Sequence, residues 1–286
     1  MRLSHTRGAG AQLPYRVRYR ETSAVKGPTV SSDLDSVNAD PAPSDPLDTA
    51  KANLVLALCF VGFLLTFWAW ALMGPLGATY KEDLGLSSFQ QSLVVALPVV
   101  VGSLGRIPVG ALTDRLGGKT MFPLIAALTI IPTLFVGFFD SSYALLIVGG
   151  FFLGIGGTSF AVGVPTVNSW FPPHRRGTAI GIFGAGMGGT AVAAFTTLRI
   201  RDAFGDQAPF ILVAVLLAIY AVVARALLQN SPNWTPAEGN WVAKAAKTLI
   251  RPVTIKLSWL YAMGFGGFVA FSVYLPTYLH NFYELD

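Results

Sequence analysis

Charged residues are scarce in this chain. Only 12% of its 286 residues are Asp, Glu, Lys or Arg, whereas 53% are apolar, and ordinary globular chains carry about 25% charged residues. Soluble enzyme folds and collagen-like repeats are therefore excluded, and the composition is typical of a protein that lies in a lipid bilayer. The single cysteine, Cys59, has no partner in the sequence, so we expect no internal disulfide.

The first fifty residues differ from the rest because they contain no long apolar run. Ser, Thr, Pro, Asp and Arg recur in residues 1–50, and such a stretch buries too little apolar surface to offset the entropy lost on ordering. We expect a disordered tail here. No apolar segment of about 7 to 15 residues follows the basic start, so we expect no cleaved secretory signal.

The remainder of the chain consists of long apolar segments separated by polar clusters. A helix of about 20 residues spans the ~30 Å hydrocarbon core of a membrane. Seven segments meet this length, which predicts an all-α membrane protein. They cover approximately residues 54–78, 88–113, 121–139, 143–170, 178–200, 208–228 and 257–281. We expect loops at the polar clusters 81–83, 114–115, 140–142, 172–176 and 201–202, and a long basic loop at 229–256.

The basic residues indicate the orientation of these spans. With a cytoplasmic N-terminus, most of the 20 Lys and Arg residues fall on the cytoplasmic side, and only Lys81, Arg199 and Arg201 fall outside. The net charge of +5 therefore reflects membrane topology, and we expect no nucleic-acid partner.

Arg106 is the one basic residue well inside a predicted span, since Arg199 and Arg225 lie near span ends, and the seven spans contain no Asp, Glu or Lys. Its insertion costs about 2.5 to 3.5 kcal/mol, so something should compensate the charge. One interpretation is that Arg106 reaches the membrane surface near Asp114. We favour the interpretation that Arg106 faces the helix bundle and binds an anion through its planar guanidinium group.

Glycine is abundant in the fourth and fifth predicted helices. In the fifth helix, small residues recur every four positions at Gly177, Gly181, Ala185, Gly189 and Ala193, which predicts close helix packing. The fourth helix is also rich in glycine. Its glycines indicate either tight packing or a thin helix that brings a substrate near the backbone. The run 154–157 lacks a preceding strand and is not a nucleotide loop. We also find no hydrolase or metal-binding pattern, and expect no enzyme activity, metal or cofactor.

The loop after the second span carries a recognisable motif. Residues 110–119 read GALTDRLGGK and resemble the G-x-x-x-D-R-x-G-R-R/K signature of major facilitator superfamily transporters. The matching residues are Gly110, Asp114, Arg115, Gly117 and Lys119. The resemblance implies a fold of twelve helices in two halves with a substrate site near the midplane. The six-helix N-terminal half would cover 51–228, the central cytoplasmic loop 229–256, and the seventh helix 257–286.

Within the superfamily, the chain resembles the nitrate/nitrite porters. The similar stretches are residues 105–108, 158–163, 170–177, 184–190 and 261–278. The resemblance implies a carrier of nitrate or nitrite in the cell membrane, in which Arg106 binds the anion. It also implies that Phe160 and Tyr261 line the site, and that the glycine-rich run of the fifth helix is the nitrate signature, at Gly186, Met187, Gly188 and Gly189. That run usually contains asparagine, which is missing here, and Asn168 is the intramembrane asparagine that remains.

Several alternatives stay open from the sequence. The family's second anion-binding arginine follows the seventh helix, so a C-terminal half is expected to be missing, and we expect that the 286-residue chain alone does not alternate between inward and outward states. A carrier of organic anions or drugs would share Asp114 and Arg115. A seven-helix remnant, or one half of a split transporter, is the non-transporting alternative. Because the spans lack Asp and Glu and the histidines His174 and His280 lie at their edges, nitrate/nitrite exchange is favoured over proton symport.

Overall fold

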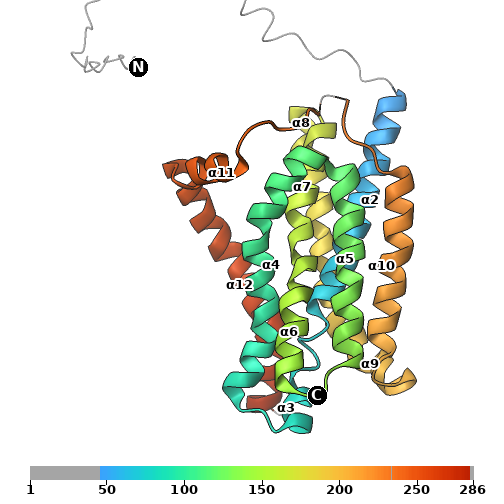
Figure 1. Cartoon of the computed structure of the whole chain (residues 1–286), viewed down its shortest axis with the longest axis vertical. Coiled ribbons are helices and arrows are strands. Elements are labelled where there is room, and N and C mark those ends of the chain that lie inside the picture. The colour runs from blue at the N-terminus through green and yellow to red at the C-terminus, as the bar shows by residue number, and fades with distance from the viewer. Residues whose placement is uncertain (1–45, 233, 284–286) are drawn as a thin grey trace, which may run out of the picture. The chain divides into compact units, whose positions relative to one another are not determined.

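The computed structural model describes residues 46–232 and 234–283, and that part of the chain contains helices and loops without a strand (Figure 1). The predicted tail lies outside the described residues up to residue 45, and residues 46–50 already belong to the first helix. In chain order the elements are α2 (Pro46–Ala71), α3 (Gly77–Leu84), α4 (Ser88–Leu116), α5 (Gly118–Phe138), α6 (Tyr143–Leu153), η1 (Gly154–Thr158), α7 (Ser159–Trp170), α8 (Pro173–Gly184), η2 (Ala185–Gly188), α9 (Gly189–Phe204), α10 (Ala208–Leu227), α11 (Trp241–Leu249) and α12 (Pro252–Tyr283).

The prediction of seven spans is confirmed by length and composition. Among the described residues, 7 helical segments are long and apolar enough to cross a membrane. They are Thr49–Ala71, Ser88–Leu116, Gly118–Phe138, Tyr143–Trp170, Pro173–Phe204, Ala208–Leu227 and Pro252–Phe271. The fold is therefore all-α.

Two short polar helices were missed by the sequence pattern. The first span ends at Ala71 instead of residue 78, and α3 then includes the predicted loop residues 81–83. Helix α3 ends at Gly85, whose φ of 62° is the left-handed conformation that glycine tolerates. The predicted loop 229–256 contains α11 and the start of α12. Both misses have one cause, because helices this short and polar carry no long apolar signal.

The predicted loops at 114–115, 172–176 and 201–202 are largely helical ends. Helix α4 continues to Leu116, α8 begins at Pro173, and α9 continues to Phe204. Charged residues at the ends of membrane helices reach the headgroup region without breaking the helix. The sequence therefore placed these boundaries too early or too late by a few residues.

The fourth and fifth spans each change from α-helix to 3₁₀-helix near the middle. The interruption is η1 in the fourth span and η2 in the fifth, and both segments are glycine-rich. Glycine is a poor helix former, and short 3₁₀ pieces often mark functional positions within longer helices. The tighter winding changes which carbonyl groups are engaged within the helix.

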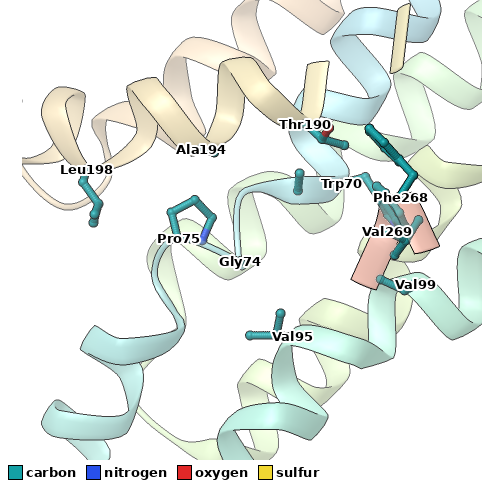
Figure 2. Close-up of a pocket in the computed structure, with 11 residues that line it drawn as sticks. Trp70, Gly74, Pro75, Val95, Val99, Thr190, Ala194, Leu198, Phe268 and Val269 are labelled. Carbon is teal, nitrogen blue, oxygen red and sulfur yellow. The ribbon is translucent and has the colours of Figure 1, made fainter. Parts of the chain in front are cut away.

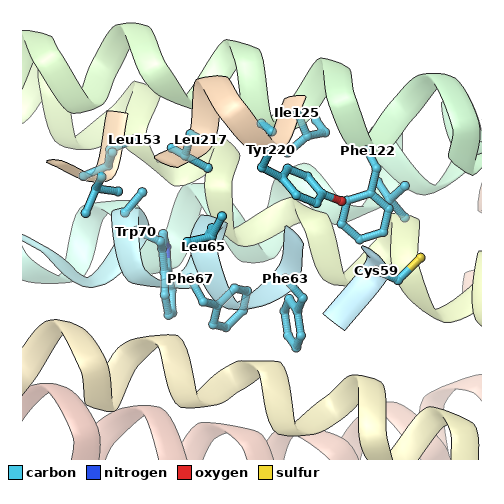
Figure 3. Packing of buried hydrophobic residues seen from close by; sticks show 14 of the residues in the cluster. Cys59, Phe63, Leu65, Phe67, Trp70, Phe122, Ile125, Leu153, Leu217 and Tyr220 are labelled. Atoms are coloured by element: carbon cyan, nitrogen blue, oxygen red, sulfur yellow. The ribbon is translucent and has the colours of Figure 1, made fainter. Parts of the chain in front are cut away.

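Helix α2 is the centre of the bundle. It packs against α5, α7, α8, α9 and α10 and against both 3₁₀ segments, and it contributes Phe63, Phe67 and Trp70 to the buried aromatic core (Figure 3). Phe63 and Phe67 meet edge to face at a ring separation of 4.3 Å, a geometry that aromatic pairs prefer. In a membrane, such close contacts rather than water exclusion hold helices together.

The predicted glycine face of the fifth span is only partly a packing surface. A side chain at Gly186 would meet Phe63 at 2.8 Å, and one at Gly189 would collide with the backbone of α2 at Leu64. Gly177 and Gly181, by contrast, have no heavy atom within 4 Å of the position of an added Cβ. The close packing that the pattern predicts is therefore present at Gly189 and absent from the described contacts of Gly177 and Gly181, and Gly186, outside the pattern, also packs closely.

We expect Gly189→Ala to lower stability and the neighbouring Gly188→Ala to have little effect. An alanine methyl at 189 collides with main-chain atoms that cannot rotate away, which costs about 1 to 3 kcal/mol, whereas Gly188 faces open space. Thermal unfolding of the purified protein in detergent measures the difference. Equal unfolding temperatures for the two variants would contradict the observed packing of α9 on α2.

Candidate functional site

Arg106 lies on α4, and its side chain turns toward the other helices. Its Nε donates a hydrogen bond to the carbonyl oxygen of Gly157 in η1 at 3.3 Å, and its Nη1 donates to the hydroxyl oxygen of Tyr261 in α12 at 3.4 Å. The guanidinium is therefore held between the second, fourth and seventh spans. The interpretation in which Arg106 extends to the surface near Asp114 is not supported by these contacts.

Aromatic rings surround the Arg106 guanidinium. Its central carbon lies 5.2 Å from the ring centroid of Phe160 and 4.7 Å from that of Phe265, both within the range of cation–π attraction. Tyr261 stacks against both rings, at 5.9 Å from Phe160 and 5.2 Å from Phe265. The ring faces thus stabilise the positive charge, and they also restrict the orientation of the planar guanidinium group.

The contact between Arg106 and Gly157 depends on a very close approach of α4 to η1. A Cβ at Gly102 would lie 2.9 Å from the carbonyl oxygen of Gly154 and 3.3 Å from the Cα of Gly157. Trp70 closes the crossing from α2, and its Nε1 donates to the carbonyl oxygen of Pro98 at 2.9 Å. Glycine is required at this crossing because any larger residue would push η1, and with it the Gly157 carbonyl, away from Arg106.

Arg106 retains unused hydrogen-bonding capacity. A guanidinium has five N–H donors, and the described residues accept one bond from Nε and one from Nη1. Among the residues that the structure describes, no carboxylate pairs with Arg106, and the ion pair present there joins Arg201 to Asp206. The Nη2 group therefore remains available to bind an oxyanion.

The bundle also contains a small cavity, which is not lined by Arg106 or by the rings around it (Figure 2). It encloses about 140 Å³ between α2, α4, α9 and α12. Phe268, one helical turn after Phe265, lines it together with Trp70, Val99 and Thr190. The Thr190 hydroxyl donates to the carbonyl oxygen of Met187 at 3.0 Å. The cavity is therefore mostly apolar and has room for a small molecule only.

The structure brings together three of the predicted site residues. Arg106, Phe160 and Tyr261 are in mutual contact. Asn168 lies two turns beyond Phe160 on α7, about 12 Å along the helix, and makes no described contact with the cluster. Sequence reasoning missed Phe265, although its position one turn after Tyr261 is a usable signal.

The predicted signature run of the fifth span does not reach Arg106 through any described contact. Gly186 and Gly189 pack on α2, Gly188 faces open space, and Met187 is half-buried against the core. The connection to the cluster is indirect, because Phe63 contacts Gly186 and its ring also lies 5.7 Å from that of Phe160.

The motif residues 110–119 form a second group at the end of the bundle where α11 lies. Arg115 donates to the carbonyl oxygen of Gly239, and the carbonyl oxygen of Asp114 accepts from the N–H of Ala237 at 3.0 Å. The segment that follows α10 is thereby attached to α4.

The turn between α4 and α5 is held by the same segment. Gly117 has a φ of 75°, a conformation that favours glycine, and the Lys119 N–H donates to Oδ1 of Asn230 at 3.0 Å. Gly110 approaches Ala161 of α7, where a Cβ would lie at 3.9 Å. The glycines of the motif thus serve a turn and a helix contact.

The fold and the motif together define a class of membrane transporter. The model of the Major Facilitator Superfamily matches residues 58–286, and the chain belongs to this family. It is a multi-pass membrane protein.

Among its relatives, the chain is 47% identical to the "Probable nitrate/nitrite transporter NarK2" of Mycobacterium tuberculosis (strain ATCC 25618 / H37Rv) over 234 residues, which cover 81% of this chain and 59% of that protein. It is 35% identical to the "Nitrite extrusion protein" of Bacillus subtilis (strain 168), over 82% of this chain and 59% of that protein. Identity to the "Probable nitrate/nitrite antiporter NarK1" of Thermus thermophilus is 34%, with coverage of 81% and 54%. The chain thus spans less than two thirds of the length of these relatives.

We expect Asn230→Ala to expose the turn between α4 and α5. The substitution removes the acceptor for the Lys119 N–H, one of the first donors of α5 that has no partner within the helix, and costs about 1 kcal/mol. Hydrogen exchange measures the effect as lost protection of the amides near residue 119. Asn240→Ala is the matched control, because Asn240 accepts from the first N–H groups of α11 and should affect α11 alone. Unchanged protection near 119 in Asn230→Ala would contradict the assignment.

Proposed function

We propose that this chain belongs to a secondary transporter that moves nitrate and nitrite across the cell membrane by alternating access. The observation that carries the proposal is Arg106, whose charge has no carboxylate partner among the described residues and whose Nη2 is free to bind. The printed names of relatives at 34% to 47% identity support the choice of anion. The proposed activity is that of a carrier without a cofactor and not of an enzyme.

The surroundings of Arg106 favour a small planar oxyanion. Planar N–H donors match the geometry of two oxygens in one plane, and the rings of Phe160, Tyr261 and Phe265 confine the space around the fork. This confined, planar geometry around Arg106 favours nitrate or nitrite over a bulky organic anion or drug.

The proposed orientation places the N-terminus and α11 in the cytoplasm. The end of α4 and the start of α8, whose sequences include Arg115, Arg175 and Arg176, lie at the same end of the bundle as α11 (Figure 1). The positive-inside rule supports a cytoplasmic location for the basic end. In the proposed organisation, residues 51–228 form the N-terminal half, 229–256 connect the halves, and 257–286 begin the second half, so that a C-terminal half completes the carrier.

The proposed mechanism is exchange of nitrate for nitrite. An empty site leaves the Arg106 charge uncompensated in a low-dielectric interior, so conformations that enclose it are costly. A bound anion neutralises the charge and stabilises those conformations selectively. The carrier then changes state readily when loaded and slowly when empty, which couples outward movement of one anion to inward movement of another.

We expect Arg106→Lys to weaken nitrate binding by about 10- to 100-fold, because an ammonium group lacks the planar fork and a charge-assisted bond contributes about 1.5 to 3 kcal/mol. Isothermal calorimetry with the purified protein measures the affinity. Arg199→Lys is the control, since Arg199 bonds to the carbonyl of Phe195 within its own helix. Wild-type affinity in Arg106→Lys, or stronger displacement of nitrate by a bulky carboxylate than by nitrite, would remove Arg106 from the nitrate site.

In vesicles that contain the transporter, nitrate uptake should require internal nitrite or nitrate and should not respond to a pH gradient. The reason is that no carboxylate among the described residues pairs with Arg106 to relay a proton. Uptake of labelled nitrate is measured with and without internal nitrite at two pH gradients. Uptake driven by the pH gradient alone would overturn exchange in favour of proton symport.

A further inference from the structure

A pair of hydroxyl groups is buried in the interior of the bundle. Thr66 lies on α2, and Ser159 is the first residue of α7. Both residues are fully buried, and their hydroxyl oxygens are hydrogen-bonded at 2.7 Å. Because the pair is enclosed by the helices that surround it, its contacts do not depend on what covers the outer faces of the bundle.

The two hydroxyl protons can be satisfied in one chain of hydrogen bonds. The Thr66 oxygen also lies 2.8 Å from the carbonyl oxygen of Gly62, one turn earlier in α2, and either hydroxyl can donate the bond between them. Donation from Ser159 to Thr66 and from Thr66 to the Gly62 carbonyl gives each proton an acceptor. In the described part of the chain, Ser159 has no other side-chain hydrogen bond, so its hydroxyl depends on Thr66.

The main chain of α2 meets that of η1 at the same level. A Cβ at Gly156 would lie 2.8 Å from the carbonyl oxygen of Thr66. The ring of Phe63, about one turn before Thr66, lies 5.7 Å from the ring of Phe160. Hydrogen-bonding, main-chain and ring contacts therefore hold the junction of η1 and α7 against α2.

Ser159 lies between the two groups of the fourth span that contact Arg106. The carbonyl oxygen of Gly157 accepts from Arg106 Nε at 3.3 Å, and the ring of Phe160 lies 5.2 Å from the guanidinium carbon. The backbone changes from 3₁₀ to α winding at this point, and 3₁₀ segments have poorer hydrogen-bond geometry than α-helices. Contacts from α2 therefore have a large influence on the direction of both groups.

We propose that Thr66 and Ser159 are positioning residues for the anion site, because their hydroxyl bond fixes the Gly157 carbonyl and the Phe160 ring beside Arg106. The proposal rests on the proposed function, which supplies nitrate as the ligand. When the bond is broken, the Nε acceptor moves, and the planar guanidinium samples orientations that present its free donors less well. The pair thus organises the site before the anion enters, which reduces the ordering that binding requires.

The first test is nitrate affinity, measured by isothermal calorimetry on the purified protein below the unfolding temperature of every variant. Thr66→Val keeps the shape of the side chain and removes the hydroxyl, so it should weaken binding about 3- to 10-fold, the factor that corresponds to one hydrogen bond. Thr66→Ser keeps the hydroxyl and should bind like wild type. Thr133→Val is the matched control, because Thr133 is also fully buried and its hydroxyl bonds to the Thr129 carbonyl within α5.

A double-mutant cycle separates positioning from a general loss of stability. Ser159→Ala should also weaken nitrate binding, and Thr66→Val/Ser159→Ala should bind no more weakly than Thr66→Val alone, because both substitutions break the same bond. Additive losses in the double variant, or an equal loss in Thr133→Val, would overturn the proposal.

The second test is independent of nitrate. NMR of the empty protein with isotope-labelled arginine observes the Arg106 Nε–H, which is assigned by its disappearance in Arg106→Lys. In Thr66→Val this resonance should shift and its proton should exchange faster with water, and Thr66→Ser should restore it. An unchanged resonance in Thr66→Val would refute the positioning role even where wild type binds nitrate. If the resonance changes as expected but wild type binds no nitrate, the positioning of Arg106 stands and the proposed function fails.

Discussion

The structure depends on one positive charge, on Arg106, that no carboxylate neutralises in the described part of the chain. Arg106 is held inside the bundle by the Gly157 carbonyl, the Tyr261 hydroxyl and the rings of Phe160 and Phe265. Cation–π contacts and neutral acceptors make the cation tolerable but leave its net charge in place. In the proposed function, a transported anion completes this compensation, and the cost of burying the arginine then favours a negatively charged substrate.

Glycines of the second and fourth spans make this arrangement possible. Gly102 and Gly157 allow α4 and η1 to approach until their main chains touch, and the 3₁₀ winding of η1 presents a carbonyl group to Arg106. Of the two interpretations that the sequence offered, tight packing is present at this crossing, and the approach of a substrate to the backbone stays a prediction. Helix α12 joins the same cluster, because its Tyr261 and Phe265 both contact the Arg106 guanidinium.

How far the sequence predicts this structure depends on the signal involved. Apolar length predicts all seven spans, and a lone arginine with a family resemblance predicts the contacts among Arg106, Phe160 and Tyr261. Helices α3 and α11 escape because short polar helices have no such length signal. Gly177 and Gly189 share one sequence pattern, yet only Gly189 meets another helix, since periodicity defines a face but not its partner. Phe265 was missed because composition alone does not distinguish one phenylalanine in an apolar run, and its helical spacing from Tyr261 is the signal that would have found it.

The structure of the protein determined with bound nitrate would test the central claim most directly. The account predicts a planar anion within hydrogen-bonding distance of the Arg106 Nη atoms, beside the rings of Phe160, Tyr261 and Phe265, with Nε still bonded to the Gly157 carbonyl. An anion bound elsewhere, with Arg106 paired to a carboxylate of the protein, would contradict it.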